Sequence, residues 1–182
     1  MPDRPQNNVQ STMMDTPLTI TSLMQFADKV HGASEIISVT ADNPEHNYTY
    51  REAFARVRKL ANALESIGAQ AGDRIATLAW NDYRHLELYY AVSCSGMICH
   101  TINPRLFPEQ ISYIANHAED SVIFLDLTFV KMVESLASDL KSVKAYVILT
   151  DEAHMPDTSL PNALCYEMFV EAEDADYAWP EF

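Results

Sequence analysis

The residues best suited to chemistry in this sequence are Asn103, Pro104, Arg105 and Leu106, directly after a β-like stretch. Pro104 has a fixed φ and no backbone N–H, so a strand cannot continue through it. Arg105 would project from a short, stiff loop, and its guanidinium offers a planar fork of donors that matches phosphate oxygens. A helix expected from Pro108 adds free N–H groups that also favour an anion. The run is therefore our candidate anion-binding loop, with a plain surface turn as the alternative.

Other familiar chemistries lack their motifs. The dinucleotide-binding and P-loop fingerprints need closely spaced glycines so that the backbone can approach phosphates. The four glycines of this chain are scattered instead, at Gly32, Gly68, Gly72 and Gly96. There is no G-x-S-x-G nucleophile elbow, and no Cys-x-x-Cys or His-x-x-x-His pair that would suit a metal ion. We therefore predict no catalytic residue and no metal ligand in this chain.

Three histidines, His85, His100 and His117, fall on separate expected elements. His100 can be interpreted in two ways, as a hydrogen-bonded histidine of the core or a cleft, or as a general base. We favour the first, because no partner for acid–base chemistry accompanies it in the sequence.

The elements that would position the loop alternate between strand and helix. Helical patterns separate successive β-like runs, which lie at 74–79, 97–102, 121–126 and 143–150, with the helices at 82–95, 108–119 and 128–140. Such alternation predicts right-handed βαβ units, and thus an α/β fold with a mainly parallel sheet flanked by helices. In an open parallel sheet, ligands bind beyond the carboxyl ends of the strands, where the anion-binding loop is expected. After residue 150 we expect an irregular stretch with one short helix near 164–172.

The first part of the chain predicts smaller elements. Short β-like runs at 36–40 and 46–50 are joined by residues 42–44, Asp-Asn-Pro, and predict a small hairpin. Residues 16–31 predict a helix from Thr21, with Leu23, Met24, Ala27 and Val30 on one apolar face that suits either core packing or an interface. Residues 1–15 are polar and lack an apolar core, so we predict a disordered tail rather than a secretory signal. Residues 16–182 then form one α/β unit.

The strongest helical pattern begins after Thr49. Thr49 and Glu52 have the capping-box spacing, apolar residues recur every three or four positions from Phe54 to Ile67, and Gly68 supplies the stop. Four basic residues fall mainly off this apolar stripe: Arg51, Arg56, Arg58 and Lys59. We expect them to form a solvated helix face, with a basic docking face as the alternative.

Composition bounds the class of protein. The chain has 182 residues, of which 48% are apolar and 21% charged, as in a globular domain. Its net charge is −14, and residues 151–182 carry nine acids and no Lys or Arg, which argues against a nucleic-acid partner and suggests a solvated acidic surface. No apolar run reaches the roughly 18 residues of a transmembrane helix. Three cysteines, an odd and sparse set, fit a reducing cytoplasm.

A family resemblance begins at the candidate loop. Residues 78–120, LAWNDYRHLELYYAVSCSGMICHTINPRLFPEQISYIANHAED, resemble the N-terminal part of the adenylate-forming enzymes, in particular medium- to long-chain fatty-acyl-CoA synthetases. The blocks YTYREAFARVRKLANALESIGAQAGDRIATLAWN, DTPLTITSLMQFADKVHG and WPEF agree in order and spacing. The resemblance extends from about residue 15 to the end. It implies that residues 16–182 form the first subdomain of a large N-terminal domain.

The resemblance also implies an activity for the full-length enzyme. Such enzymes join a fatty acid to the α-phosphate of ATP, with Mg²⁺ assisting, and then pass the acyl group to the thiol of coenzyme A (CoA). They hold the phosphates with a Thr/Ser/Gly-rich loop that ends in lysine, and no such loop lies in residues 1–182. In relatives this loop follows shortly after a WPEF-like segment, so we expect the chain to stop just before it. We expect the 182 residues to be inactive alone and to bind none of these ligands tightly.

The same resemblance gives the candidate loop a partner. It implies that residues 103–106 lie beside the CoA nucleotide and that Arg105 meets its phosphates. It also implies that the leader, residues 18–31, helps to form a homodimer, and that the protein is cytoplasmic. Two other hypotheses remain: a free-standing module that binds CoA, a nucleotide or a partner without catalysis, and an unrelated flavodoxin-like receiver or scaffold, which leaves the INPRLFPEQ run unexplained.

Overall fold

The structure is a computed structural model that describes residue 13 and residues 16–182. The predicted disordered tail, residues 1–15, therefore lies outside the described residues except for Met13. Within the described part, none of the helices combines the length and the apolar character that crossing a bilayer requires.

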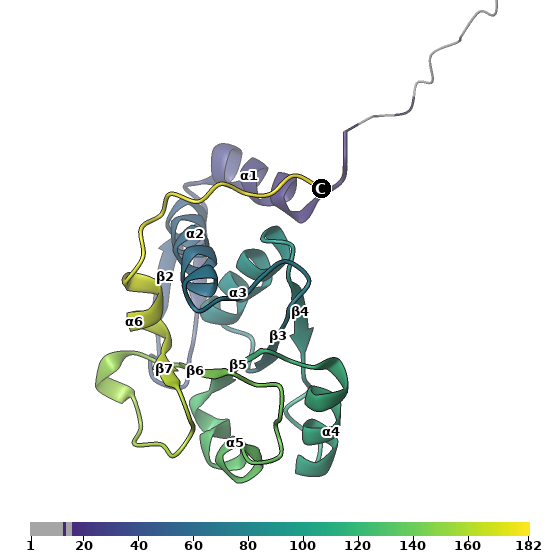
Figure 1. The fold of residues 1–182 in the computed structure, drawn as a ribbon. Helices are drawn as coiled ribbons and strands as arrows, with labels where there is room; N and C mark the ends of the chain where they lie inside the picture. The colour runs from purple at the N-terminus through teal and green to yellow at the C-terminus, as the bar shows by residue number, and fades with distance from the viewer. Residues whose placement is uncertain (1–12, 14–15) are drawn as a thin grey trace, which may run out of the picture.

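A five-stranded parallel sheet forms the centre of the molecule (Figure 1). Its strand order is β4-β3-β5-β6-β7, and the strands are β3 (Arg74–Leu78), β4 (Ile98–Thr101), β5 (Val122–Asp126), β6 (Ala145–Leu149) and β7 (Ala163–Cys165). This parallel sheet with flanking helices confirms the predicted fold class. The sequence analysis missed β7, because three residues are too few to show a period of two.

Helices cover both faces of the sheet (Figure 1). One face carries α2 (Tyr50–Ser66), α3 (Tyr83–Cys94) and α6 (Tyr166–Glu171), and the other carries α4 (Pro108–Ala118) and α5 (Val130–Leu136). Strand β5 shows the division, since Val122 and Phe124 pack with the first group and Ile123 and Leu125 with the second. Burial on both faces explains the continuous apolar run of this strand. The helix predicted over 128–140 is shorter, a 3₁₀ turn (Leu127–Phe129) followed by α5.

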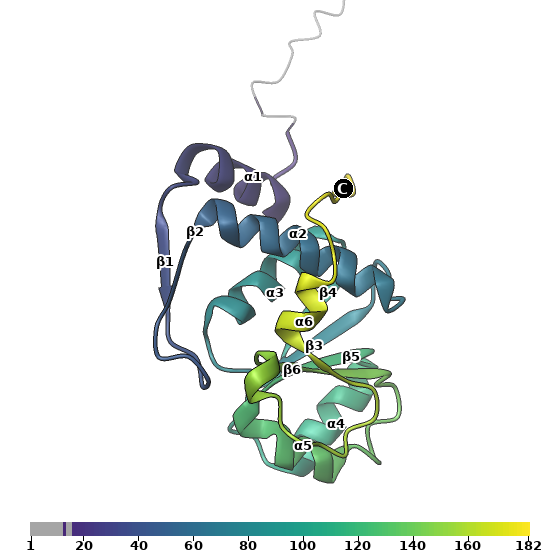
Figure 2. The same cartoon turned by 90° about the vertical axis from the view of Figure 1, so that its left-hand side faces the viewer.

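The predicted hairpin is present beside this layered core, as strands β1 (Glu35–Ser38) and β2 (His46–Thr49) pair antiparallel (Figure 2). Helix α1 (Ile20–His31) lies against α2 and α3. Its predicted apolar face is only partly buried, because Leu23 and Val30 are 63% and 55% exposed and Met24 is buried. The contact with the core is a narrow strip through Met24 and Ala27, which leaves the neighbouring apolar positions outside.

Helix α2 begins and ends as predicted. The Thr49 hydroxyl accepts from the Glu52 N–H at 3.3 Å, and the Glu52 carboxylate accepts from the Thr49 N–H at 2.8 Å, which completes the capping box. Gly68 has a φ of +84°, the left-handed conformation that ends a helix.

The backbone of the acidic C-terminal segment is held on α2. Arg58 donates to the Ala175 carbonyl at 3.0 Å, and Asn62 donates to the carbonyls of Asp174 and Asp176. The segment then runs along α2 to α1, where the chain end lies (Figures 1 and 2). The solvated interpretation of the basic face of α2 is therefore corrected, since Arg56 and Lys59 bind Glu171 and Arg58 binds the Ala175 carbonyl. The expectation of a solvated acidic surface holds for most acidic side chains of residues 151–182, which are exposed.

Candidate functional site

An open pocket of about 350 Å³ lies at the carboxyl ends of β3 and β4. Its lining comes from the ends of both strands and from α3: Ala79, Trp80, Asn81, His85, Tyr89, Thr101, Ile102, Asn103, Pro104 and Arg105. A pocket in this place is what the parallel sheet predicts, since the strands end there and the following loops diverge.

Three of the four predicted loop residues line this pocket. Strand β4 ends at Thr101, and the Asn103 carboxamide oxygen accepts from the Arg105 N–H at 3.0 Å, which fixes the turn. The Arg105 side chain is exposed at the rim and forms no ion pair within the described residues. Leu106 is not in the lining; it packs beneath the loop against the core on the α4 and α5 side. The expected helix start at Pro108 also lies outside the lining.

Two aromatic residues of the pocket, Trp80 and Tyr89, were missed by the sequence analysis. Each is 42% exposed, so each offers part of a ring to the pocket. Trp80 is fixed from behind, because its indole N–H donates to the Thr128 hydroxyl at 3.0 Å and its ring lies 5.2 Å from that of Phe129. Trp80 directly follows the predicted strand 74–79, so the carboxyl-end rule applied to β3 would have found it.

His85 closes the pocket from α3 as a neutral ring. Its Nδ1 lies 3.2 Å from the Trp80 carbonyl, which can only accept, and its Nε2 lies 3.0 Å from the Thr77 hydroxyl, which can donate. Burial lowers the pKa of His85, although the Trp80 carbonyl partly opposes this. The ring stacks on Tyr89 at 4.7 Å. His85 thus continues the aromatic wall and carries no charge at neutral pH.

This arrangement is suited to binding rather than to bond breaking. A wall of aromatic rings offers stacking area to a planar group, and Arg105 at the rim offers donors to a phosphate. Among the lining residues no nucleophile is activated by a base, since both nitrogens of His85 are engaged. The geometry therefore favours a ligand that combines a flat ring with negative charge.

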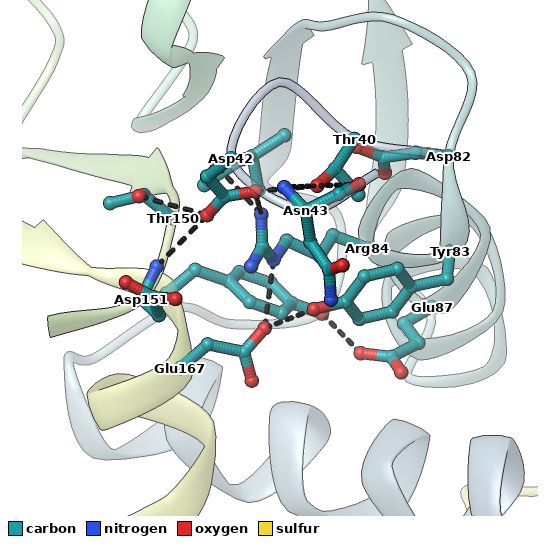
Figure 3. Close-up of polar contacts among 12 residues, drawn as sticks. Thr40, Asp42, Asn43, Asp82, Tyr83, Arg84, Glu87, Thr150, Asp151 and Glu167 are labelled. Atoms are coloured by element: carbon teal, nitrogen blue, oxygen red, sulfur yellow. Dashed lines mark hydrogen bonds and ion pairs between the residues drawn. The ribbon is translucent and has the colours of Figure 1, made fainter. Parts of the chain in front are cut away.

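A buried ionic cluster lies on the face of the sheet that α2, α3 and α6 cover, around Arg84 at the start of α3 (Figure 3). Arg84 donates to Asp42 of the hairpin turn at 2.8 Å and to Glu167 of α6 at 2.7 Å, and its side chain is 3% exposed. Asp42 also accepts from the Thr150 hydroxyl at 3.0 Å. Burial alone would raise the pKa of Asp42, yet hydrogen bonds from Arg84 and Thr40 hold it well below its usual range. Three distant segments are thus joined through one guanidinium.

Arg56 of α2 extends the same cluster. Its guanidinium binds Glu87 at 2.7 Å and Glu167 at 2.8 Å, and Glu87 also accepts from the Tyr166 hydroxyl at 2.6 Å. Burial raises the pKa of Glu87, which Arg56 and Tyr166 counteract. Each charge that the fold buries here has an opposite partner, as the cost of burying charge requires.

Two further groups have metal-ligand or catalytic residue types. Among the described residues, Asp42, Asp151 and His154 lie close enough to share a cation, but Asp42 is bound by Arg84 and Asp151 accepts from His154 Nδ1 at 2.7 Å. His100 contacts both oxygens of the buried Asp120, at 2.8 and 2.9 Å from Nδ1. His100 thus has the hydrogen bond that the favoured interpretation requires, and that interpretation stays a prediction.

Comparison with known proteins identifies the family. The family model described as AMP-binding enzyme matches residues 25–176, most of the chain. The chain belongs to the AMP-binding enzyme family. The pocket and the ionic cluster both lie within the residues that the family model matches. The resemblance inferred from residues 78–120 is confirmed.

Curated relatives of this AMP-binding family chain are CoA ligases. It is 44% identical over 170 residues to a 3-methylmercaptopropionyl-CoA ligase of Ruegeria lacuscaerulensis, and 44% identical over 169 residues to a medium-chain-fatty-acid–CoA ligase of Ectopseudomonas oleovorans. Both alignments cover 93% of this chain, but 32% and 31% of the relatives. A long-chain-fatty-acid–CoA ligase of Thermus thermophilus is 40% identical over 147 residues, which is 81% of this chain and 27% of that protein. The chain thus spans about a third of the length of these relatives.

Solved structures share the fold. A putative long-chain-fatty-acid CoA ligase from Rhodopseudomonas palustris matches with a TM-score of 0.72 and 23% identity, over 91% of this chain and 39% of that one. A mutant form of coronafacic acid ligase from Pectobacterium brasiliense matches with a TM-score of 0.74 and 14% identity, over 90% and 31%. At these identities the likeness concerns the fold alone.

Proposed function

We propose that this chain is part of an AMP-forming fatty-acid–CoA ligase. In the proposed reaction a fatty-acid carboxylate attacks the α-phosphate of ATP, pyrophosphate leaves, and the CoA thiol then displaces AMP from the acyl-adenylate. The observation that carries the proposal is the 44% identity with CoA ligases over 93% of the chain. In the full-length enzyme ATP, CoA and the fatty acid are substrates and Mg²⁺ assists; we propose no magnesium ligand among the described residues.

The acyl substrate is the finer part of the proposal. Relatives named for medium-chain fatty acid and for 3-methylmercaptopropionate are equally similar to this chain, and a relative named for long-chain fatty acid follows. We propose a fatty acid, which two of these three names share. The test is kcat/KM of the full-length protein for fatty acids of increasing length and for 3-methylmercaptopropionate. A higher value for the thioether acid than for every fatty acid would overturn this assignment.

The 182 residues are proposed to be inactive alone. Activation of a carboxylate needs a cradle for the triphosphate, and the printed sequence holds no Thr/Ser/Gly-rich loop that ends in lysine. Purified chain incubated with ATP, labelled pyrophosphate and a fatty acid should give exchange no higher than a blank. Exchange above the blank would refute the inactivity.

The pocket is proposed to be the CoA side of the site. Its support is Arg105, which is exposed at the rim without an ion pair in the described part, and the rings of Trp80 and Tyr89 beside it. In the full-length enzyme Arg105→Ala should raise the KM for CoA roughly tenfold or more, the worth of a charged hydrogen bond. ATP–pyrophosphate exchange, which needs no CoA, should be unchanged. Lys131→Ala, which removes an exposed charge on α5, is the matched control; an equal effect of both variants would contradict the assignment.

The unpaired Arg105 also supports the second candidate, a free-standing CoA- or nucleotide-binding module. Calorimetry of the 182 residues with CoA separates the two candidates. Heat with micromolar affinity that Arg105→Ala abolishes and Lys131→Ala preserves would favour the module. Absence of heat, with CoA dependence in the full-length protein, would favour the ligase.

A homodimer through the leader is proposed as well, and a cytoplasmic location remains a prediction. Helix α1 and the adjoining hairpin expose large apolar side chains, including Leu18, Leu23, Phe26, Val30 and Ile37. Such a surface is unusual in a monomer and is typical of an interface. Leu23→Glu should shift the sedimentation coefficient from dimer to monomer, whereas Gln25→Glu, on the same helix at an exposed polar position, should not. A wild-type monomer at high concentration would contradict the dimer.

A further inference from the structure

His46 of strand β2 has an unusual environment in the hairpin. Its ring stacks on that of Tyr83 of α3, with centroids 3.6 Å apart and planes 11° from parallel. The rings of His46 and Tyr48 pack edge to face, with centroids 4.7 Å apart. The His46 Nε2 is buried and has no hydrogen-bond partner within the described residues. A neutral ring tolerates this, because an unprotonated Nε2 is only an acceptor, but a protonated ring would hold a buried N–H without an acceptor.

Charged side chains from α2, α3, α6 and the turn of the hairpin lie near His46. Arg56 of α2 and Arg84 of α3 lie 5.8 and 5.0 Å from the Tyr83 ring centroid. The neighbouring carboxylates are already bound by these two arginines: Glu87 by Arg56, Asp42 by Arg84, and Glu167 by both. Tyr48 and Tyr83 add neutral hydroxyls. A proton on His46 would therefore place a third cation beside two arginines whose partners are already engaged.

We propose that His46 makes the β1–β2 hairpin an acid-sensitive latch, which leaves α3 when the ring takes up a proton while the five-stranded sheet stays folded. The polar ties of the hairpin to the core are the Tyr83 N–H, which donates to the Ser38 hydroxyl at 3.0 Å, and Asp42 of the turn, which binds Arg84, Thr150 and the Asp151 N–H (Figures 2 and 3). Opening must break the buried Asp42–Arg84 pair, so it is a rare event at neutral pH, and a proton on His46 makes it more frequent. The sheet pairs through other strands entirely.

The latch would act on the pocket as well. Ser38 accepts from the first residue of α3, and Trp80 and Asn81, just before that residue, line the pocket. Release of the hairpin would remove the contact at the first residue of α3, next to this part of the lining, while Trp80 stays held by Thr128. The inference concerns a conformational change and stands independently of the reaction proposed above.

The direction of the pH dependence follows from linkage. Burial lowers the pKa of His46, Arg56 and Arg84 lower it further, and Glu167 partly opposes them. The open hairpin would have an ordinary histidine with a pKa of about 6.5. Opening then takes up one proton between these two values, so the opening constant should rise as the pH falls from about 6.5 toward the lowered pKa of His46, by at most about tenfold per pH unit. Asp42 and Glu167 stay ionised in this window because their pKa values are lowered.

Amide hydrogen exchange of the 182-residue chain tests the latch, comparing wild type with His46→Phe, which keeps a stacked ring but cannot titrate. Protection factors, corrected for intrinsic exchange, are compared from about pH 7.5 to about pH 5. In wild type the protection of the amides of residues 35–49 should fall as the pH drops below about 6.5, by at most about tenfold per pH unit, while β5 and β6 stay protected. In His46→Phe the hairpin should show no such loss. His85, also buried, is present in both proteins and cannot produce the difference.

Equal pH dependence of the hairpin in the two proteins would overturn the inference. A second measurement covers the case in which the variant fails to fold: the His46 ring protons of wild type are followed by NMR. Their midpoint should lie below 6.5 and coincide with the loss of hairpin protection. A protonated His46 in a fully protected hairpin would also overturn it.

Discussion

At the scale of single residues, the main feature of the structure is a set of charged side chains that are buried in ion pairs. Glu87 is completely buried, as are nearly all of the Asp42 and Arg84 side chains, and each has its counter-ion within hydrogen-bonding distance. Such clusters contribute little net stability compared with apolar packing, but they are costly to break, since the remaining charge stays buried without a partner. This asymmetry makes the cluster sensitive to single substitutions.

Glu87→Ala should therefore destabilise the protein by roughly 3–5 kcal/mol, because it leaves Arg56 without its main buried partner. Lys131→Ala is the control: it breaks an ion pair with Glu134 from a side chain that is 84% exposed, and should hardly move the unfolding midpoint. Urea unfolding at neutral pH measures both. Similar midpoints for the two variants would show that the buried pair is not what holds α2 to α3.

Asp42 should make the stability depend on pH in the acid range. Its pKa in the folded protein lies below that of an unfolded Asp, about 3.9, so its contribution is complete above about pH 4 and is lost as the pH falls further. Asp42→Asn should thus be less stable than wild type at neutral pH, and the difference should shrink by about pH 3. The exposed Asp139→Asn should differ little from wild type at both pH values. A constant difference between wild type and Asp42→Asn would contradict the role of this carboxylate.

Residue-scale prediction from the sequence succeeded where the signal was local. The position of Asn103 and Arg105 in a pocket lining was predictable because a proline marks the end of a strand, and strand ends in parallel sheets carry ligands; their role in binding stays a prediction. Arg56 was misread, because the spacing along a helix shows which residues leave the apolar stripe but not that carboxylates more than a hundred residues later meet them. Charge pairing across such distances has no sequence period.

At the scale of elements, the sequence specifies the ends of α2 more sharply than those of any other helix. The capping box and the left-handed Gly68 are local devices, and both are present as predicted. The short strand β7 was missed, and the exposed part of the α1 face was left undecided, for the opposite reason. Both depend on what packs beside them, and a three-residue strand or a half-covered helix carries too weak a pattern.

The capping box yields a prediction for α2. Thr49→Ala removes the hydroxyl that accepts from the Glu52 N–H, and should cost about 1 kcal/mol of unfolding free energy. Thr49→Ser keeps the hydroxyl and should recover most of this loss. Because His46 and the hairpin lead directly into α2, the loss should also appear as faster amide exchange in its first turn. If Ser and Ala cost the same, the methyl group of Thr49 rather than its hydroxyl would be responsible.

At the scale of the whole molecule, the C-terminal segment connects elements that are far apart in sequence. It leaves α6, runs along α2 and reaches α1 (Figure 1). The Phe182 ring at its end lies over Gly96, which is part of the link between α3 and β4. A Cβ at Gly96 would lie 3.0 and 3.1 Å from two ring atoms of Phe182, closer than side chains normally pack. Gly96 therefore has two roles: it adopts the left-handed conformation of the turn, and its missing side chain leaves room for the Phe182 ring.

Gly68 allows these two roles to be separated. Gly96 and Gly68 have similar φ values, +77° and +84°, but a Cβ at Gly68 would meet no atom within 4 Å. Alanine at either position should cost about 1–2 kcal/mol, because an L-residue is strained in the left-handed region. Phe182 is 62% exposed and can turn aside, so the contact should add little to the cost at Gly96. Only Gly96→Ala should move the NMR signals of the Phe182 ring, however, since only there does the methyl group enter the room that the ring occupies. A loss several kcal/mol larger for Gly96→Ala would mean that the segment is held rigidly against the sheet, and unmoved ring signals would mean that Phe182 does not rest on Gly96 in solution.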